Sequence, residues 1–576
     1  MKKLPLSFVF CLLSSTLLAV IQPLWPEGKI PDFQENQIAA PSQEVKKPGF
    51  DRAAHRMPYL EWAEKPANPN GACMILISGG GYGCTCDGPA FKPLEKVLLD
   101  NGITCVYLWY RTPRPQGLPI YQVGWEDGQR AVRLVRAAAQ ERGFDPERIG
   151  VLGCSAGSHL SVMLATSALA PAYAKIDEID EIPCHVNWAI PMCVAYALTD
   201  GIVRANARDG DAPDVRLNPS FKFDAKTCPI CLFHGGKDPY SPNGSTQIYR
   251  QLRRMKIPAE VHLDPDRGHG VVSSAQFGRA IEFMRQMGFL GPVGAAVELA
   301  KRFPDDSARG SYEKKAVWPE GKMPDVQTNQ CTPYLEWHMP KELKTKAIQI
   351  IYSGGSYTGN NPDGFEVAPT RRYLNAKGMA VVTVKYRTPR PLKGLQKHVT
   401  AWQDLQRVIR IVRSEAPARG LDPDRIGIMG SSAGGHLTLM GATSSRHKSY
   451  SPIDALDKIP CNVQWAVAIY PAYALTDGAE KHNTTGGNDD SARLVPEFSF
   501  DLDTCPILFI HGDADGWASM NSVKCWEQLR RMGIQGELHT LATRTHCFQR
   551  KASPGTGSYT WNDRIWEFLT FKGFNK

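Results

Sequence analysis

Several classes of function lack their usual signals in this sequence of 576 residues. No block rich in lysine and arginine occurs, and a formal net charge of +9 is modest for this length, so nucleic acid is not an expected partner. No glycine-rich dinucleotide fingerprint follows a predicted strand. No group of histidines, cysteines and carboxylates has the spacing of metal ligands. We therefore expect neither a cofactor nor a metal.

Long apolar runs are scarce, and the one candidate lies at the N-terminus. Residues 4–20 are largely apolar and follow Lys2 and Lys3. A basic start before an apolar run is typical of a secretory signal peptide, which we predict for residues 1–21. The alternative is an uncleaved membrane anchor, because the run approaches bilayer-spanning length. The signal peptide predicts an exported protein, periplasmic or extracellular, without membrane contact after cleavage.

The rest of the chain contains two similar copies of one sequence unit. "WPEGKIPDFQENQ" begins at Trp25 and "WPEGKMPDVQTNQ" at Trp318, and "PYLEW", "YRTPRP", "AYALTDG" and "QLRRM" recur in the same order. Each unit has the size of a domain and there are two of them, so the pattern indicates a tandem duplication rather than a solenoid. We predict domains over residues 22–290 and 318–576. Residues 291–317 contain glycine, proline and mixed charge, which predicts a linker.

Each copy alternates short apolar runs with amphipathic stretches. The stretch 124–140 has helical periodicity, and the apolar runs of the first copy are Met74–Ser78, Thr104–Tyr110, Arg148–Gly153, His185–Ile190, Ile230–Gly235 and Ala259–Leu263. Strands that are apolar almost throughout, alternating with helices, are typical of a parallel sheet covered on both faces. The sequence therefore predicts an α/β fold in both copies, with a small lid between about Thr199 and Phe223 in the first.

One serine in each copy stands between glycines, after a predicted strand and before a predicted helix. The strings are "GCSAGSHL" around Ser155 and "GSSAGGHL" around Ser432, 277 residues apart. G-x-S-x-G in this context is the signature of a nucleophile elbow, whose tight turn exposes the serine Oγ and needs flanking glycines. The turn also leaves amides at a helix N-terminus free to bind an oxyanion. We interpret both serines as nucleophiles.

A catalytic serine needs a histidine base and an acid, which follow it in the chain in this architecture. Asp238 in "HGGKD" and His269 in "DRGHG" meet this order in the first copy. Asp515 and His546 meet it in the second copy at the same offset of 277. Asp513 competes with Asp515, but its counterpart is a glycine, so Asp515 is preferred. Both copies therefore carry a candidate catalytic triad.

An oxyanion hole needs a second amide, from the loop after an earlier strand. That loop reads "ISGGGYG" in the first copy and "YSGGSYTG" in the second. The candidate donors are Gly80, Gly81 and Ala156, and Gly355, Ser356 and Ala433. The alternative is that the glycines form a tight turn only.

Other repeated residues have structural interpretations. His159 and His436 lie on the helix after the elbow and are expected to be packed or hydrogen-bonded rather than catalytic. Asp127 with Arg130 is expected to make structural ion pairs on a helix, as are the counterparts in the second copy. These positions are therefore assigned to the scaffold.

Cysteine, by contrast, is plentiful, with fifteen residues. An exported chain permits disulfides. Cys184 and Cys228 each stand just before one of two successive strands, as do Cys461 and Cys505, and both pairs are 44 residues apart. Neighbouring parallel strands lie about 4.8 Å apart, within disulfide reach. We predict both bridges; free thiols at the end of a sheet are the alternative.

These motifs resemble one known family. The opening "WPEGK", the "GGGY" loop, "YRTPRP", "RIGVLGCSAGSHL", "HGGKD" and "GHG" together make each copy similar to the secreted bacterial acetyl xylan esterases and related carbohydrate esterases of the α/β-hydrolase fold. The copies differ from one another where Tyr470–Pro471 replaces Cys193–Val194. The resemblance implies two α/β-hydrolase domains that remove acyl groups, in particular acetyl, from polysaccharide through an acyl-enzyme. It implies an acylated carbohydrate or other small ester as the partner, and it leaves the oligomeric state open.

Two other functions fit part of the sequence. A prolyl-oligopeptidase-like peptidase shares the hydrolase fold, but no repeat here suggests the propeller that gates such a site. Alternatively, one copy is catalytic and the other is a degenerate carbohydrate-binding or structural domain. Complete triads in both copies favour two active sites over that arrangement.

Overall fold

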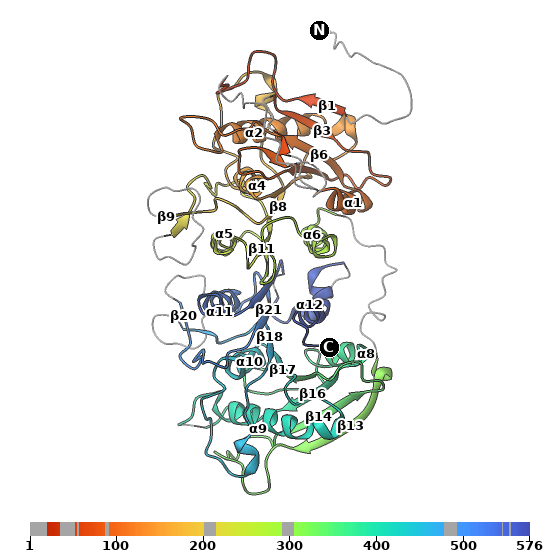
Figure 1. The fold of residues 1–576 in the computed structure, drawn as a ribbon, viewed down its shortest axis with the longest axis vertical. Helices are drawn as coiled ribbons and strands as arrows, with labels where there is room; N and C mark the ends of the chain where they lie inside the picture. The colour runs from red at the N-terminus through yellow and green to blue at the C-terminus, as the bar shows by residue number, and fades with distance from the viewer. Residues whose placement is uncertain are drawn as a thin grey trace.

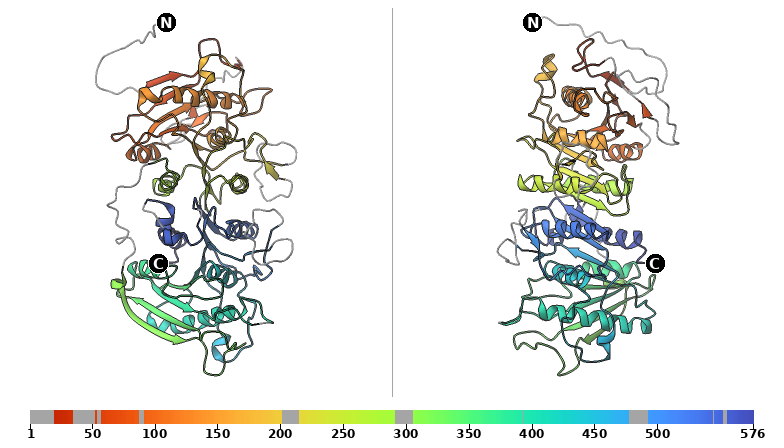
Figure 2. Two further views of the ribbon diagram at one scale, coloured as in Figure 1. Left: turned by 180° about the vertical axis from the view of Figure 1, so that it is seen from behind. Right: turned by 60° about the vertical axis from the view of Figure 1, so that its left-hand side comes forward.

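The computed structural model describes residues 20–34, 52–53, 57–86, 91–200, 215–290, 305–392, 394–476, 492–543, 545–551 and 555–576. The two copies lie end to end in an elongated molecule (Figures 1 and 2), and one continuous sheet of sixteen strands runs through both. The predicted signal peptide lies outside the described residues except for Val20 and Ile21, which form part of a strand. Among the described helices, none is long and apolar enough to cross a membrane.

The first copy contributes eight strands to this sheet. In spatial order they are β1 (Val20–Pro23), β3 (Tyr59–Trp62), β6 (Thr104–Trp109), β4 (Cys73–Ile77), β7 (Ile149–Cys154), β8 (Trp188–Met192), β11 (Ile230–Gly235) and β12 (Ala259–Asp264). Strands β6 to β12 run parallel, and β1 and β3 add antiparallel pairs at the outer edge. Every predicted apolar run is a strand, although the run that begins at His185 becomes extended only at Trp188.

Helices cover both faces of this half of the sheet. Ile75 and Ile77 of β4 pack in the same core as α2 and α4, whereas Met74 and Leu76 pack with α1 and α6. This alternation along one strand is why the run is apolar throughout. The helices are α1 (Lys92–Asp100), α2 (Gln122–Ala137), α3 (Ala139–Arg142), α4 (Ala156–Thr166), η3 (Glu178–Glu181), α5 (Asn243–Arg254) and α6 (Ser274–Gln286).

The second copy repeats this plan in mirrored strand order. Its strands are β22 (Gly536–Leu541), β21 (Ile507–Gly512), β18 (Trp465–Ile469), β17 (Ile426–Ser431), β15 (Ile348–Tyr352), β16 (Ala380–Lys385), β14 (Tyr334–Pro340) and β13 (Arg309–Ala316). Its helices are η4 (Asp306–Ala308), α8 (Ala368–Ala376), α9 (Val399–Glu415), η5 (Pro417–Arg419), α10 (Ala433–Thr443), η6 (Ala455–Lys458), α11 (Met520–Arg531), η7 (Phe548–Lys551) and α12 (Gly557–Phe571). The predicted fold of two tandem α/β-hydrolase domains is confirmed.

The predicted linker extends too far toward the C-terminus. β13 lies within residues 291–317, yet it pairs antiparallel with β14 as the edge strand of the second copy. β1 precedes the "WPEGK" motif of the first copy in the same way. These two edge segments share no recognisable string, so the comparison of the copies did not reveal them. The rest of the linker, residues 291–304, lies outside the described residues.

Three two-stranded antiparallel sheets lie outside the main sheet in the described residues. β9 (Leu198–Asp200) pairs with β10 (Val215–Leu217), and β19 (Leu475–Thr476) pairs with β20 (Arg493–Leu494). β2 (Arg52–Ala53) pairs with β5 (Thr85–Cys86). The β9–β10 hairpin occupies the predicted lid, whose residues 201–214 lie outside the described residues.

The two copies join through β12 and β22, which pair antiparallel. His262 lies opposite His539, its own counterpart 277 residues later, so an approximate twofold axis passes between the two. Their Nδ1 atoms are 3.0 Å apart, and their Nε2 atoms contact Glu260 at 3.0 Å and Glu537 at 2.6 Å. All four side chains are buried, so the junction is a closed polar network within the sheet.

The prediction of two disulfides is wrong. Cys184, Cys228, Cys461 and Cys505 are free, buried cysteines. β8 and β11 pair with Ala189 opposite Ile230, which sets Cys228 level with residue 187, three residues beyond Cys184. The Cys184 thiol instead donates to the Ala168 carbonyl at 3.3 Å. The second copy has the same register offset, and the sequence spacing alone could not reveal it.

Candidate active site

Both serines occupy a strained elbow. Ser155 has φ 58° and ψ −119°, and Ser432 has φ 53° and ψ −117°, each directly before the first residue of a helix. These positive φ values are unusual outside glycine and hold the Oγ clear of the sheet. The flanking glycines are needed for space, because a Cβ at Gly434 would lie 2.5 Å from the Tyr352 carbonyl oxygen. The elbow predicted from sequence is confirmed in both copies.

The second copy brings its three predicted residues into one hydrogen-bonded chain. His546 Nε2 lies 2.9 Å from Ser432 Oγ, and His546 Nδ1 lies 2.8 and 2.9 Å from the two carboxylate oxygens of Asp515. Asp515 follows β21, His546 follows β22, and both loops stand at the carboxyl end of the sheet with the elbow. Ser432 and Asp515 are buried, while His546 is partly open to solvent. The arrangement can transfer a proton from serine to histidine.

The first copy forms the acid–base half of the same arrangement. His269 Nδ1 lies 2.8 and 3.0 Å from the two oxygens of Asp238. Burial raises the pKa of Asp238, but hydrogen bonds from His234 and His269 outweigh it, so the net pKa lies well below the usual range. Asp238 is therefore an anion at neutral pH. In this structure no hydrogen bond joins Ser155 to His269, so this triad is less tightly assembled than the second.

The predicted oxyanion loops press against the nucleophiles. A Cβ at Gly79 would lie 2.9 Å from the Ser155 Cβ, and a Cβ at Gly354 would lie 2.9 Å from the Ser432 Cβ. Gly355 follows with φ 120°, and a Cβ there would lie 2.0 Å from the Gly359 carbonyl oxygen, so only glycine fits.

The Gly354 amide is not available to a substrate, because it donates to Glu366 Oε2 at 2.7 Å. The amides of Gly355, Ser356 and Ala433 donate to no acceptor among the described residues. They are the open donors beside Ser432. The equivalent amides in the first copy are those of Gly80, Gly81 and Ala156.

Arginines of the repeated "YRTPRP" motif hold these loops in place, a role the sequence did not reveal. Arg114 Nε donates to the Gly81 carbonyl at 2.8 Å, and Arg390 Nε donates to the Ser356 carbonyl at 3.0 Å. Each also donates to a tyrosine hydroxyl, Tyr196 at 2.9 Å and Tyr473 at 3.2 Å. The repetition of the motif was the available signal. The arginine fixes the carbonyl side of the peptide and thereby the direction of the neighbouring amides.

The histidines after the elbow support the same loops. Tyr82 contacts His159 Nδ1 at 2.8 Å through its hydroxyl, as Tyr357 contacts His436 Nδ1. Burial lowers the pKa of His159 to about 3, so its ring is neutral. Both histidines are hydrogen-bonded, as expected, and the contact ties each oxyanion loop to the elbow helix.

Asp127 and Arg130 of helix α2 both make structural ion pairs, although with other residues rather than with one another. Asp127 binds Arg111 at 3.0 Å and Trp25 Nε1 at 2.7 Å, and Arg130 binds Asp177 at 2.6 Å. Asp404, Arg387 and Trp318 repeat the first of these contacts. These residues tie the "WPEGK" opening to the sheet.

Asp513, the competitor of Asp515, serves the junction between the copies. Its Oδ2 accepts from the Ala259 amide at 3.0 Å and from Arg253 at 3.4 Å, both in the first copy. It therefore faces away from His546 toward the neighbouring domain, and the choice of Asp515 agrees with the geometry.

A cavity of about 460 Å³ opens at Ser432, and one residue of its wall, Glu366, has no acidic counterpart in the first copy. Glu366 is buried there, accepts from the Gly354 amide and from the Tyr470 hydroxyl at 3.1 Å, and burial raises its pKa. Position 366 has no acidic counterpart in the first copy, and Cys193 replaces Tyr470. The Cys193 thiol donates to the Gly270 carbonyl at 3.1 Å, in the loop of His269.

The fold and the elbow together define an α/β-hydrolase fold with a candidate nucleophile in each copy. The chain belongs to the BD-FAE family, whose model matches residues 62–190 and 335–528. The first match runs from β3 through the elbow into β8, and the second runs from β14 through the elbow into α11.

Curated relatives are similar over part of their length. Endo-1,4-beta-xylanase B of Butyrivibrio fibrisolvens is 27% identical over 210 residues, which are 34% of this chain and 32% of the relative. Acetylxylan esterase of Xylanibacter ruminicola is 32% identical over 215 residues, 36% of this chain and 42% of the relative. The chain thus spans about a third to a half of the length of the curated relatives it matches.

Among solved structures, an acetyl ester-xyloside bifunctional hydrolase from Caldicellulosiruptor lactoaceticus is 23% identical, with a TM-score of 0.37. The alignment covers 47% of this chain and 98% of that one. A truncated carbohydrate esterase from gut microbiota is 22% identical, also with a TM-score of 0.37, and covers 47% and 99%.

Proposed function

We propose that the protein is an exported serine carboxylesterase that removes acyl groups, in the first place acetyl, from a polysaccharide, with one active site in each copy. The observation that carries the proposal is the continuous contact from Ser432 through His546 to Asp515 beneath open amide donors. The names of the curated relatives, xylanase and acetylxylan esterase, support a carbohydrate ester as substrate. The basic and apolar N-terminal residues support export.

The first half of the reaction transfers the acyl group to serine. Ser432 Oγ attacks the ester carbonyl carbon while His546 Nε2 takes the hydroxyl proton, and Asp515 stabilises the imidazolium at Nδ1. The developing oxyanion lies between the Ala433 amide and the amides of Gly355 and Ser356. When the tetrahedral intermediate collapses, the bond to the sugar oxygen breaks, and His546 returns the proton to that oxygen. The deacylated sugar leaves, and the acyl group stays on Ser432.

The second half repeats these steps with water. His546 removes a proton from water as its oxygen attacks the acyl carbon, and the same amides stabilise the second oxyanion. Collapse breaks the bond to Ser432 Oγ, which regains its proton from His546. The products are the free acid and the original enzyme. Ser155, His269 and Asp238 take the same roles in the first copy.

The test is release of acid from acetylated xylan and from a feruloylated xylan, identified by mass spectrometry. We compare the wild type with Ser155→Ala, Ser432→Ala and the double variant. Each single variant is expected to keep part of the activity, and the double variant to lose at least about three orders of magnitude. Acid release by the double variant at the wild-type rate would reject the proposal.

A second candidate has one catalytic copy and one copy that binds carbohydrate. The missing hydrogen bond between Ser155 and His269 favours it, because a copy that has lost catalysis no longer needs its serine and histidine in contact. In that case Ser432→Ala alone abolishes activity on every substrate while circular dichroism shows a folded chain. A carbohydrate pulldown with this variant then reports whether the first copy retains the polymer.

A further inference from the structure

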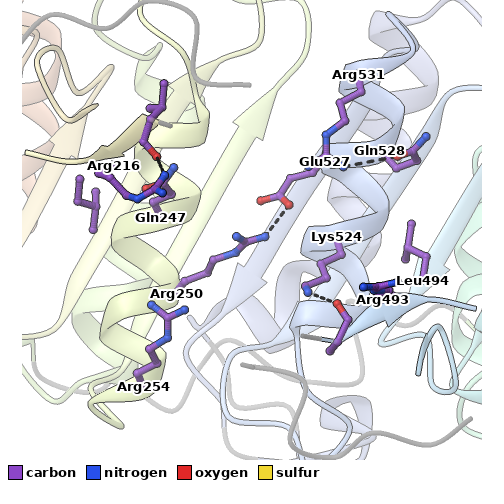
Figure 3. Close-up of a pocket in the computed structure, with 13 residues that line it drawn as sticks. Arg216, Gln247, Arg250, Arg254, Arg493, Leu494, Lys524, Glu527, Gln528 and Arg531 are labelled. Carbon is purple, nitrogen blue, oxygen red and sulfur yellow. Dashed lines mark hydrogen bonds and ion pairs between the residues drawn. The ribbon is translucent and has the colours of Figure 1, made fainter. Parts of the chain in front are cut away.

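A cleft of about 780 Å³ lies between the two copies, on the side of the sheet covered by α5 and α11 (Figure 3). α5 and β10 supply one wall, and α11 and β20 supply the other. Because the walls come from different copies, neither copy forms this cleft alone. It is larger than the cavity at Ser432, and the triads have no residue in it.

The walls of this interdomain cleft are strongly cationic. Five arginines and one lysine line it, and Glu527 is the only acidic residue among its described lining residues. Arg250 already engages Glu527, with Nη2 at 2.5 Å from Oε2, and Thr246 donates to the same carboxylate at 3.3 Å. The one acidic residue of the described walls is therefore paired with a lining arginine, and cationic side chains outnumber it six to one there.

The cations are arranged in pairs by the duplication. Arg216 and Arg493 are 277 residues apart, as are Arg254 and Arg531, so each pair is related by the approximate twofold axis. Figure 3 shows these side chains on both walls, with Arg250 and Glu527 between them. An extended ligand that crosses the axis therefore meets guanidinium groups toward both ends of its path.

The chemistry of the lining fits a ligand that carries both carboxylates and hydroxyls. Guanidinium groups bind carboxylates through two parallel hydrogen bonds, and the amides of Gln247 and Gln528 suit hydroxyl groups. No aromatic side chain is among the described residues of the walls, so the stacking platform that single-stranded nucleic acid uses is missing there. Carboxylates and hydroxyls on one extended chain are the composition of an oligosaccharide that carries uronic acids.

We propose that the interdomain cleft binds a uronate-bearing segment of the polysaccharide that the two active sites deacylate. The choice of a carbohydrate rests on the proposed function, whereas the requirement for negative charge rests on the cleft itself. Binding here holds the polymer at the junction of the copies, from which acylated stretches extend toward the two sites.

The experiment measures binding without turnover. The parent is the full chain with Ser155→Ala and Ser432→Ala, titrated calorimetrically with a deacetylated glucuronoxylan oligosaccharide, a neutral xylo-oligosaccharide of the same length, a sulfated oligosaccharide and inorganic phosphate. Into this parent we introduce Arg493→Gln with Arg531→Gln, and as a matched control Arg425→Gln with Arg446→Gln, which removes two arginines of the same copy outside the cleft. Thermal melting by circular dichroism checks that each variant folds.

The expected result is binding of the uronate-bearing oligosaccharide that weakens at least about tenfold in the cleft variant, weakens as salt is raised, and is unchanged in the control. Equal affinity in the cleft and control variants, equal binding of the neutral oligosaccharide, or no binding would overturn the proposal. Tighter binding of the sulfated oligosaccharide or of phosphate would overturn the assignment to uronates. Because no ester is cleaved here, failure of the esterase proposal shows only in the acid-release assay.

Discussion

The two copies carry the same candidate catalytic residues in different surroundings. Asp515 and His546 repeat the contact of Asp238 and His269 almost atom for atom, but the hydrogen bond to the nucleophile exists only at Ser432 in this structure. Glu366 lines the cavity beside Ser432 and accepts a hydrogen bond from Tyr470, and neither residue has an equivalent in the first copy. The difference teaches that the duplication kept the triad and the elbow and varied the walls that meet the substrate. We therefore expect two active sites with different rates and substrate preferences.

The largest expected effect on activity follows from replacing the aspartate of each candidate triad. Asp515→Asn in a Ser155→Ala background leaves the second copy as the only reporter, and we expect kcat on p-nitrophenyl acetate to fall about 10⁴-fold, because asparagine does not hold the catalytic tautomer of His546. Asp238→Asn in a Ser432→Ala background should have the same effect on the first copy.

Asp513→Asn, two residues from Asp515, is the control within the same loop. It removes charge from the contacts to Arg253 and the Ala259 amide, so we expect a loss of about 1–3 kcal/mol in the free energy of unfolding with kcat little changed. A kcat that collapses in Asp513→Asn and survives in Asp515→Asn would reverse the assignment.

Substitution of Glu366, which only the second copy has, is expected to have a smaller effect on kcat. This carboxylate fixes the Gly354 amide at 2.7 Å, and the first copy has no such residue. In the Ser155→Ala background, Glu366→Ala should lower kcat by about ten- to a hundredfold, less than the full loss of an oxyanion donor. Glu366→Gln keeps an acceptor and should restore most of the rate.

The measurement is kcat and KM for p-nitrophenyl acetate, repeated in the Ser432→Ala background, where the first copy alone reports. A change confined to KM would show that Glu366 binds the substrate and does not hold the oxyanion loop. An equal loss in both backgrounds would show that the substitution damages the whole chain.

The smallest predicted effect is on stability at the junction of β12 and β22, where both copies place the same glutamate and histidine. Burial raises the pKa of Glu260 and of Glu537 to about 8, and burial holds the pKa of His262 and His539 well below the usual value. Between about pH 4.5 and about pH 8 these carboxyls are protonated in the folded chain and ionised in the unfolded chain. They therefore lower the free energy of unfolding increasingly as the pH rises through this range. The histidines cost stability as pH falls below about 6.5.

The two effects oppose one another below about pH 6.5, so the net decline in stability is expected between about pH 6.5 and 8. Glu260→Gln with Glu537→Gln should flatten this decline in thermal midpoints measured across that window. Glu147→Gln with Glu313→Gln removes two exposed glutamates as the control and should keep it. An unchanged slope in the junction variant would show that these carboxyls do not titrate with unfolding.

Much of this architecture was predictable because it is encoded in local patterns. Apolar runs gave the parallel strands, and the repeated offset of 277 picked out Ser, Asp and His together. What depends on register or on backbone pairing was not predictable. The three-residue offset between β8 and β11 separates Cys184 from Cys228, and β13 is an edge strand with no apolar signature. Glu366 could not be predicted because the first copy has no equivalent residue. The interdomain cleft could not be predicted because it forms only where the two folded copies meet.

Labelling with a fluorophosphonate tests most directly whether both copies carry a working nucleophile. Intact-mass spectrometry of the wild type should show two adducts, one adduct in Ser155→Ala and in Ser432→Ala, and none in the double variant. Peptide mapping should place the label on Ser155 and on Ser432, with faster labelling at Ser432, whose Oγ already lies 2.9 Å from His546 Nε2. A single adduct in the wild type, on Ser432 alone after prolonged exposure, would contradict the account.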